Sequence, residues 1–223
     1  MAYELSGSIE AGNVTHTFVP ARDNTQTFGG SISPDGTKIA VKSDRHGGAT
    51  ELDRGIDIWH SGASGWFEAD SIDLGDSGTP IVDSIYWYSN TEILVVVSDA
   101  LRSFTSSSSG WSSNYTTEFG TSFFPAHMWV SPGKTVLGFS QEINWFFDSL
   151  MDNTKHVKLI HSSSAGFTSI KTIDNNLGLG SDRFEEGAIT AMTWPDEENV
   201  LIGQSHRDND DGRVTHFRSG SSG

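Results

Sequence analysis

The densest cluster of groups that could do chemistry is a set of carboxylates close to the C-terminus. Directly before Gly212 stand Asp208, Asp210 and Asp211. Carboxylate oxygens are the ligands that Ca²⁺ takes in proteins, and an EF-hand series needs Asp or Asn at the first, third and fifth positions before the glycine. Arg207 occupies the first of those positions here. The spacing therefore favours a solvated turn, with calcium as the one cofactor worth testing and no other cofactor expected.

The remaining metal-binding residue types do not gather. The chain has eight histidines and no cysteine. No pair of histidines has a helical or short metal-ligand spacing, and without cysteine the chain can form neither a disulfide nor a thiolate metal site. We expect no histidine-bound or cysteine-bound metal.

Catalytic motifs are also missing from the sequence. A glycosidase needs two facing carboxylates, and Asp83 is the one acid that we place on an inner strand. No Gly-x-Ser-x-Gly elbow and no phosphate-binding glycine loop is present. The run from Ser33 to Gly36 differs from a sialidase Asp box, because its glycine comes one residue too early and no tryptophan follows. The sequence predicts no catalytic residues and a chain that is not an enzyme.

Three consecutive aromatic residues are the strongest candidate for a binding site. Trp145, Phe146 and Phe147 lie in a long loop between residues 142 and 156, flanked by acidic residues. Three neighbouring rings cannot all point into one sheet. One reading is that the loop packs on its own sheet, and the other is that a ring faces outward as an anchor for a partner protein or a sugar.

The elements that would position these loops recur along the chain. Each of four segments has an alternating strand, a polar turn and a strongly apolar strand; they span residues 28–44, 81–99, 123–141 and 188–206. A second hairpin follows each of the first three segments, with a Ser/Gly/Ala turn. After the fourth segment the last strand is missing, and residues 13–20 (NVTHTFVP) have the pattern of the strand that would complete it.

The first turn, Ser33-Pro34-Asp35-Gly36-Thr37, followed by an apolar strand, resembles the inner hairpin of WD-repeat and TolB-type propeller blades. The resemblance implies an all-β fold: a β-propeller of four blade repeats, each with four antiparallel strands, and a ring closed by the N-terminal strand. The four repeated segments predict one domain over residues 1–223, with blade units at about 13–64, 65–109, 110–165 and 166–223. The alternative is an open arc that another copy of the chain completes.

Charge and hydropathy exclude two classes of partner. The formal net charge is −15, with 29 acidic and 14 basic residues. Such a surface repels phosphate backbones, so we expect no nucleic acid partner. It is typical of a soluble protein, and a salt-adapted source would also explain it. The first twelve residues do not read as a secretory signal, and the longest aliphatic run, residues 93–97, is too short to span a membrane.

Two sequons occur, Asn13-Val14-Thr15 and Asn114-Tyr115-Thr116, and either could be glycosylated in a compartment that carries out this modification.

These observations favour a non-enzymatic propeller that acts as a binding or assembly module, in an extracellular or virion surface assembly. Its partner would be another protein or copies of itself. The alternative is a glycan-binding propeller, and a glycoside hydrolase ranks below both. The insertions fall on one face of the expected propeller, so that face is the predicted binding face.

Overall fold

The computed structural model describes eight stretches of the chain: residues 26–47, 51–74, 82–97, 100–119, 125–141, 157–173, 189–204 and 213–218. Every regular element in them is a β-strand. No helix in these stretches is long and apolar enough to cross a membrane.

The strands form four antiparallel sheets, each from consecutive segments of the chain. The first sheet holds β1 (Gln26–Ile32), β2 (Lys38–Gly47), β3 (Glu51–Gly62) and β4 (Gly65–Asp73). The second holds β5 (Val82–Trp87), β6 (Glu92–Val97), β7 (Ala100–Ser107) and β8 (Gly110–Glu118). The third holds β9 (Pro125–Val130), β10 (Val136–Gln141), β11 (Val157–Ser163) and β12 (Gly166–Ile173). The fourth holds β13 (Ile189–Thr193), β14 (Asn199–Gln204) and β15 (Arg213–Arg218). We call these sheets blades 1 to 4.

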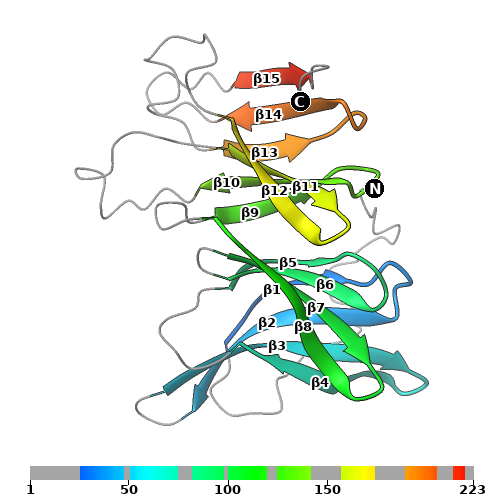
Figure 1. The fold of residues 1–223 in the computed structure, drawn as a ribbon. Helices are drawn as coiled ribbons and strands as arrows, with labels where there is room; N and C mark the ends of the chain where they lie inside the picture. The colour runs from blue at the N-terminus through cyan, green and yellow to red at the C-terminus, as the bar shows by residue number, and fades with distance from the viewer. Residues whose placement is uncertain are drawn as a thin grey trace, which may run out of the picture.

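The blades follow one another in space as they do in sequence. Figure 1 shows them face to face, with blade 1 at one end of the stack and blade 4 at the other. The first strand of each blade lies next to the first strand of the following one: β1 contacts β5, β5 contacts β9, and β9 contacts β13. The prediction of an all-β fold with propeller-like blades is confirmed at this level. A closed ring is not shown, and the predicted unit boundaries stay a prediction.

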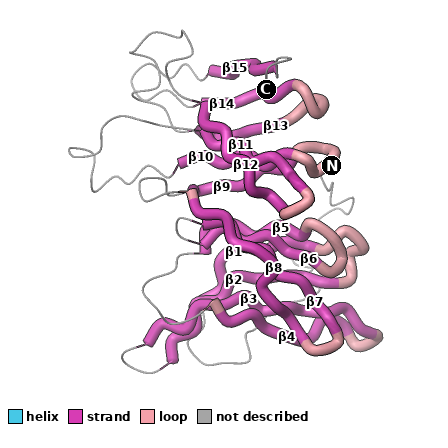
Figure 2. The backbone as a smooth tube through the Cα atoms, viewed as in Figure 1, coloured by secondary structure: helices cyan, strands magenta, loops and turns pink. Residues whose placement is uncertain are grey.

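Tight turns define the hairpins. In the first turn Ser33 N donates to Lys38 O at 2.9 Å, and Gly36 takes a φ of 72°, a backbone conformation that glycine adopts without steric cost. The equivalent turn of blade 3 has Lys134 in the same left-handed region, at a φ of 58°. These connections lie together along one side of the stack in Figure 2.

Three apolar clusters lie between neighbouring blades and hold the stack together. The second strand of blade 2, β6, is buried on both faces. Ile93 and Val95 pack in the cluster with blade 1, whereas Leu94 and Val96 pack in the cluster with blade 3. A third cluster, between blades 3 and 4, includes Trp194. A strand buried on both faces loses the hydrophobic alternation of a half-exposed strand.

Candidate functional site

The residues predicted from sequence as binding sites lie outside the described residues. This applies to Trp145, Phe146 and Phe147, and to Asp208, Asp210 and Asp211. Partner binding by the aromatic loop and calcium binding by the aspartates stay predictions. The backbone of Asp83 lies in β5, but its side chain is outside the described part of the structure.

Polar contacts join the inner hairpin turns of blades 1 and 2. Asn90 Oδ1 accepts from Asp35 N at 3.1 Å, and its backbone oxygen accepts from Lys38 Nζ at 2.8 Å. The same ammonium group lies 5.8 Å from the ring centroid of Trp87, whose Nε1 donates to Ser31 O at 2.9 Å. Hydrogen bonds from the Ser33 hydroxyl and from Thr37 lower the pKa of Asp35 to about 2.

The same turns are joined between blades 2 and 3. Tyr88 OH donates to Lys134 O at 3.3 Å, and Lys134 Nζ donates back to Tyr88 O. The lysine nitrogen lies 5.4 Å from the centroid of the tyrosine ring. Burial and the negative charge of Glu92 raise the pKa of Tyr88.

A single carboxylate joins blade 4 to blade 3. Glu197 accepts hydrogen bonds from Ser131 Oγ at 3.0 Å, from Gly133 N and from Thr135 Oγ1. Burial raises the pKa of Glu197, but these three donors outweigh it and hold the pKa below its ordinary value. The groups at all three junctions are engaged in joining blades, so we assign them a structural role.

A partly buried set of polar contacts lies within blade 2 and at its junction with blade 3. Glu92 accepts from Ser103 Oγ at 2.6 Å, and Thr117 Oγ1 donates to Phe167 O at 2.5 Å. Burial, followed by the charge of Glu92, raises the pKa of Tyr115 to about 12. Ser103 is fully buried, so its hydroxyl cannot meet a substrate.

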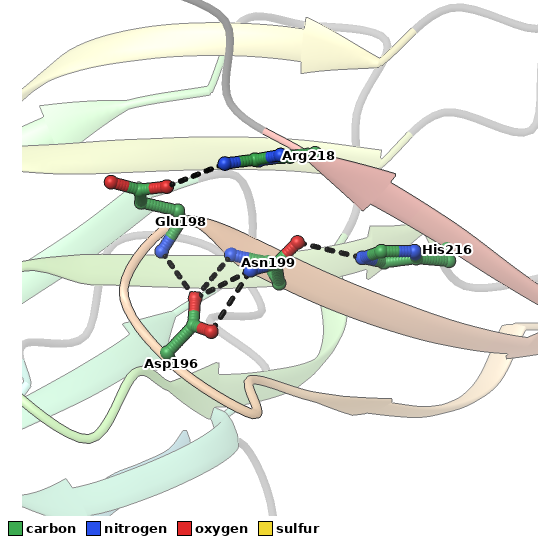
Figure 3. Close-up of polar contacts among 5 residues, drawn as sticks. All are labelled: Asp196, Glu198, Asn199, His216 and Arg218. Carbon is green, nitrogen blue, oxygen red and sulfur yellow. Dashed lines mark hydrogen bonds and ion pairs between the residues drawn. The ribbon is translucent and has the colours of Figure 1, made fainter.

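A further polar cluster among the described residues lies at the surface of blade 4 (Figure 3). Asp196, in the turn between β13 and β14, accepts from Asn199 Nδ2 through both carboxylate oxygens, at 2.7 and 2.9 Å. It also accepts from the backbone nitrogens of Glu198 and Asn199, each at 2.9 Å. The hydrogen bond from the Asn199 side chain, followed by that from Glu198 N, lowers the pKa of Asp196.

Asn199 connects this carboxylate to an imidazole. His216 Nε2 lies 2.7 Å from Asn199 Oδ1. Because Asn199 Nδ2 donates to Asp196, its Oδ1 must accept, so Nε2 of His216 carries a hydrogen. In the neutral ring Nδ1 is then the acceptor. We call Asp196, Asn199 and His216 the blade 4 relay.

The relay opens onto the face of blade 4 that points away from blade 3. Val200 and Ile202 of β14 are buried against blade 3, whereas His216 pairs with Leu201, on the opposite face. His216 is exposed. On the same strand, two residues further on, Arg218 Nη2 lies 3.4 Å from Glu198 Oε2, with side chains 72% and 65% exposed. A base with a fixed tautomer and a weakly paired cation therefore stand on one open surface.

Sequence reasoning missed the relay. The sequence pattern predicts only a polar turn within residues 188–206, where Asp196 lies, and it includes His216 only as one of eight histidines without a metal-ligand spacing. The available signal was the asparagine three residues after Asp196, together with a histidine on the next strand. Within the described stretches, no group of three or more His, Cys, Asp or Glu residues could hold a metal ion.

Comparisons with known proteins identify the fold but no family. No protein-family model matches the chain, and no curated protein matches its sequence. Among solved structures, a protein from Lactobacillus plantarum is similar over 85% of this chain and 69% of its own, with a TM-score of 0.52 and 11% identity. A mutant of puromycin hydrolase complexed with PGG is similar over 86% of this chain, with a TM-score of 0.51 and 11% identity. A chain from a study of two prolyl endopeptidases reaches a TM-score of 0.48, at 11% identity and over 88% of this chain.

This chain spans about a quarter of the length of two of these proteins, 27% of the puromycin hydrolase chain and 28% of the prolyl endopeptidase chain. The likeness corrects one expectation. A chain of an enzyme, puromycin hydrolase, contains this fold, so the propeller fold does not indicate a non-enzymatic protein, and the expectation of a non-enzymatic binding or assembly module, with glycan binding as its alternative, is wrong as an inference from the fold. At this level of identity, what the chain shares with these proteins is a propeller fold.

Proposed function

We propose that the chain is a hydrolase in which His216 is the general base that activates water. The observation that carries the proposal is the blade 4 relay, in which Asp196 orients Asn199 and Asn199 in turn fixes the tautomer of an exposed imidazole. The fold that the chain shares with puromycin hydrolase is compatible with hydrolysis and identifies no substrate.

The proposed reaction uses Nδ1 of His216, because Nε2 is engaged with Asn199. Water would attack the carbonyl carbon of an ester or amide while one of its protons passes to His216 Nδ1. The protonated ring would then return that proton to the departing alcohol or amine. Because Nε2 donates to Asn199, the imidazolium is stabilised by the oriented amide and, through it, by the Asp196 carboxylate.

Arg218 is placed to stabilise the oxyanion. It alternates with His216 on β15, so both side chains project from the same face, with their Cα atoms about 7 Å apart. Its contact with Glu198 is a single exposed one, which a developing negative charge can replace.

The proposal requires an open arc of blades. Blade 4 has three described strands and the other blades have four, and β15 ends its sheet. In a closed ring blade 1 would pack on the face of blade 4 that carries His216 and Arg218, and it would cover both side chains. A cysteine at Thr17 and another at Thr215 should therefore form no disulfide within the monomer, and efficient crosslinking of a series of such pairs would refute the open arc.

The function is tested with a panel of chromogenic esters and anilides. The wild-type chain should hydrolyse at least one, and His216→Ala should lower kcat/KM on it by about 10²–10⁴-fold. Asn199→Leu should cause a smaller loss, because it leaves the imidazole in place but unoriented. His161→Ala, at an exposed histidine of β11, is the matched control and should keep full activity. No turnover on any substrate, or full turnover by His216→Ala, would refute the proposal.

A further inference from the structure

The second sequon lies on the outer edge of blade 2. Asn114, Tyr115 and Thr116 belong to β8, which is the last strand of its sheet (Figure 1). Asn114 and Thr116 are exposed, whereas Tyr115 is partly buried between blades 2 and 3. The first sequon, at Asn13, is outside the described residues.

Asn114 is the extra residue of a β-bulge. Phe104 of β7 pairs with Ser113, and the preceding Ser103 pairs with Tyr115, so Asn114 has no partner across the ladder. A bulged residue is left unpaired and bends its strand. The acceptor amide is therefore held on an open edge at a position where the ladder is already interrupted.

The edge of β8 also lacks the charges that the other outer strands carry. β4 contains Glu68, Asp70 and Asp73, β12 contains Lys171, and β15 contains two arginines. In β8 the only charged residue is Glu118, the last of nine. Charged side chains on an edge strand prevent it from pairing with the edge of another molecule. Eight uncharged positions in a row leave β8 without that protection.

We propose that Asn114 is a site of N-glycosylation and that the glycan protects the edge of β8. Asn114 Nδ2 would bond to the anomeric carbon of a lipid-phosphate-linked oligosaccharide, supplied with its transferase by the cell that makes the protein. The bond from that carbon to the phosphate oxygen breaks, the lipid phosphate leaves, and the amide loses one proton. The site is independent of the hydrolase proposal, because it lies on a different blade.

Occupancy is tested by translating the full chain, behind a secretion leader, in the presence of microsomes. The wild type should gain a glycan on the peptide that spans residues 110–118, and endoglycosidase should remove it. Thr116→Ala should abolish glycosylation of this peptide, although Asn114 is intact, and Thr116→Ser should retain it. A glycan found only at Asn13, or no glycan at all, would overturn the proposal.

The protective role needs a second measurement, on purified protein. Removing the glycan with Asn114→Gln should raise the fraction that sediments at high concentration. Adding Ser112→Lys to that variant should reverse the increase, because it puts a charge on the same edge. Ser64→Lys adds the same charge at the tip of the β3–β4 hairpin, and it should not reverse the increase. Equal sedimentation of the glycosylated and Asn114→Gln proteins would overturn the proposal that the glycan protects the edge of β8. An equal decrease in sedimentation with Ser112→Lys and with Ser64→Lys would also overturn it.

Discussion

Replacing Glu197 by alanine tests how blade 4 is held on blade 3. The side chain belongs to blade 4, but its three hydrogen-bond donors belong to the hairpin turn of blade 3: Ser131 Oγ, Gly133 N and Thr135 Oγ1. The substitution removes all of these contacts at once and leaves the apolar cluster around Trp194 in place.

The expected loss follows from the exposure of these groups. A hydrogen bond to a charged group contributes about 1.5–3 kcal/mol when buried, but an exposed charged contact contributes about 1 kcal/mol or less. Gly133, Thr135 and Glu197 are exposed, whereas Ser131 is buried, so about 0.5 kcal/mol for each of the Gly133 and Thr135 bonds and about 1 kcal/mol for the Ser131 bond are appropriate, or about 2 kcal/mol in total. With a urea m-value of about 2–3 kcal/mol/M, the unfolding midpoint should fall by about 0.7–1 M.

The matched control is the neighbouring glutamate. Glu198→Ala removes a single exposed contact, at 3.4 Å, to Arg218 within blade 4. It should change the free energy of unfolding by about 0.5 kcal/mol or less. Urea unfolding of both variants, followed by circular dichroism and tryptophan fluorescence, measures the difference. Equal midpoints for the two variants would refute the assignment of Glu197 as the side chain that joins blade 4 to blade 3.

The pH dependence of stability in a second variant at this position, Glu197→Gln, provides a further check. The folded state holds the pKa of Glu197 below its ordinary value of 4.5, so it favours the charged form. The contribution to stability is complete above that value and is lost as the pH falls through the lower folded pKa. The stability difference between wild type and Glu197→Gln should therefore shrink as the pH falls below about 4.5. A stability difference that stays constant to lower pH would contradict the role of the charged Glu197 carboxylate in joining the blades.

Three further substitutions test turns and junctions by the same unfolding measurement. Gly166→Ala places a methyl group about 2.6 Å from the Tyr115 ring at a φ of 92°, and should cost more than Gly36→Ala, which has a φ of 72° but nothing within 4 Å. We expect about 1 kcal/mol at Gly36 and about 2–3 kcal/mol at Gly166, and equal losses would refute the role of the tyrosine contact. Asn90→Ala removes the acceptor for Asp35 N and should cost about 1 kcal/mol, and no loss would show that this junction adds nothing to stability.

Much of the fold was predictable because it depends on local patterns. Turn residues such as those from Ser33 to Gly36 mark the inner hairpins, and the run from Ile93 to Val97 marks a strand buried on both faces. These signals lie within about twenty residues of one another, so each hairpin could be assigned from its own segment.

The packing between blades could not be predicted in the same way. Glu197 meets Ser131 across 66 residues of sequence, and Asn90 meets Asp35 across 55. Which turn residues meet depends on how one sheet sits on the next, and the turn sequences differ between blades. Bulges such as that at Asn114 depend on side-chain packing on both sides of a strand, so strand patterns do not reveal them.

The candidate site was less predictable than the fold. The sequence directed attention to long loops with unusual composition, such as residues 145–147, which lie outside the described residues. The blade 4 relay uses ordinary residues in a short turn and on an adjacent strand. The side chains of the relay come together only because the register pairs Asn199 with Arg218 and Leu201 with His216, which brings the imidazole next to the turn.

The most direct test of the proposed function is the hydrolytic rate of His216→Ala, measured with and without added imidazole on a substrate that the wild type hydrolyses. If His216 supplies the base, the variant should be nearly inactive, and imidazole should restore part of the rate in proportion to its concentration. A variant as active as the wild type, or an inactive but folded one that imidazole does not revive, would contradict the role of His216 as the base.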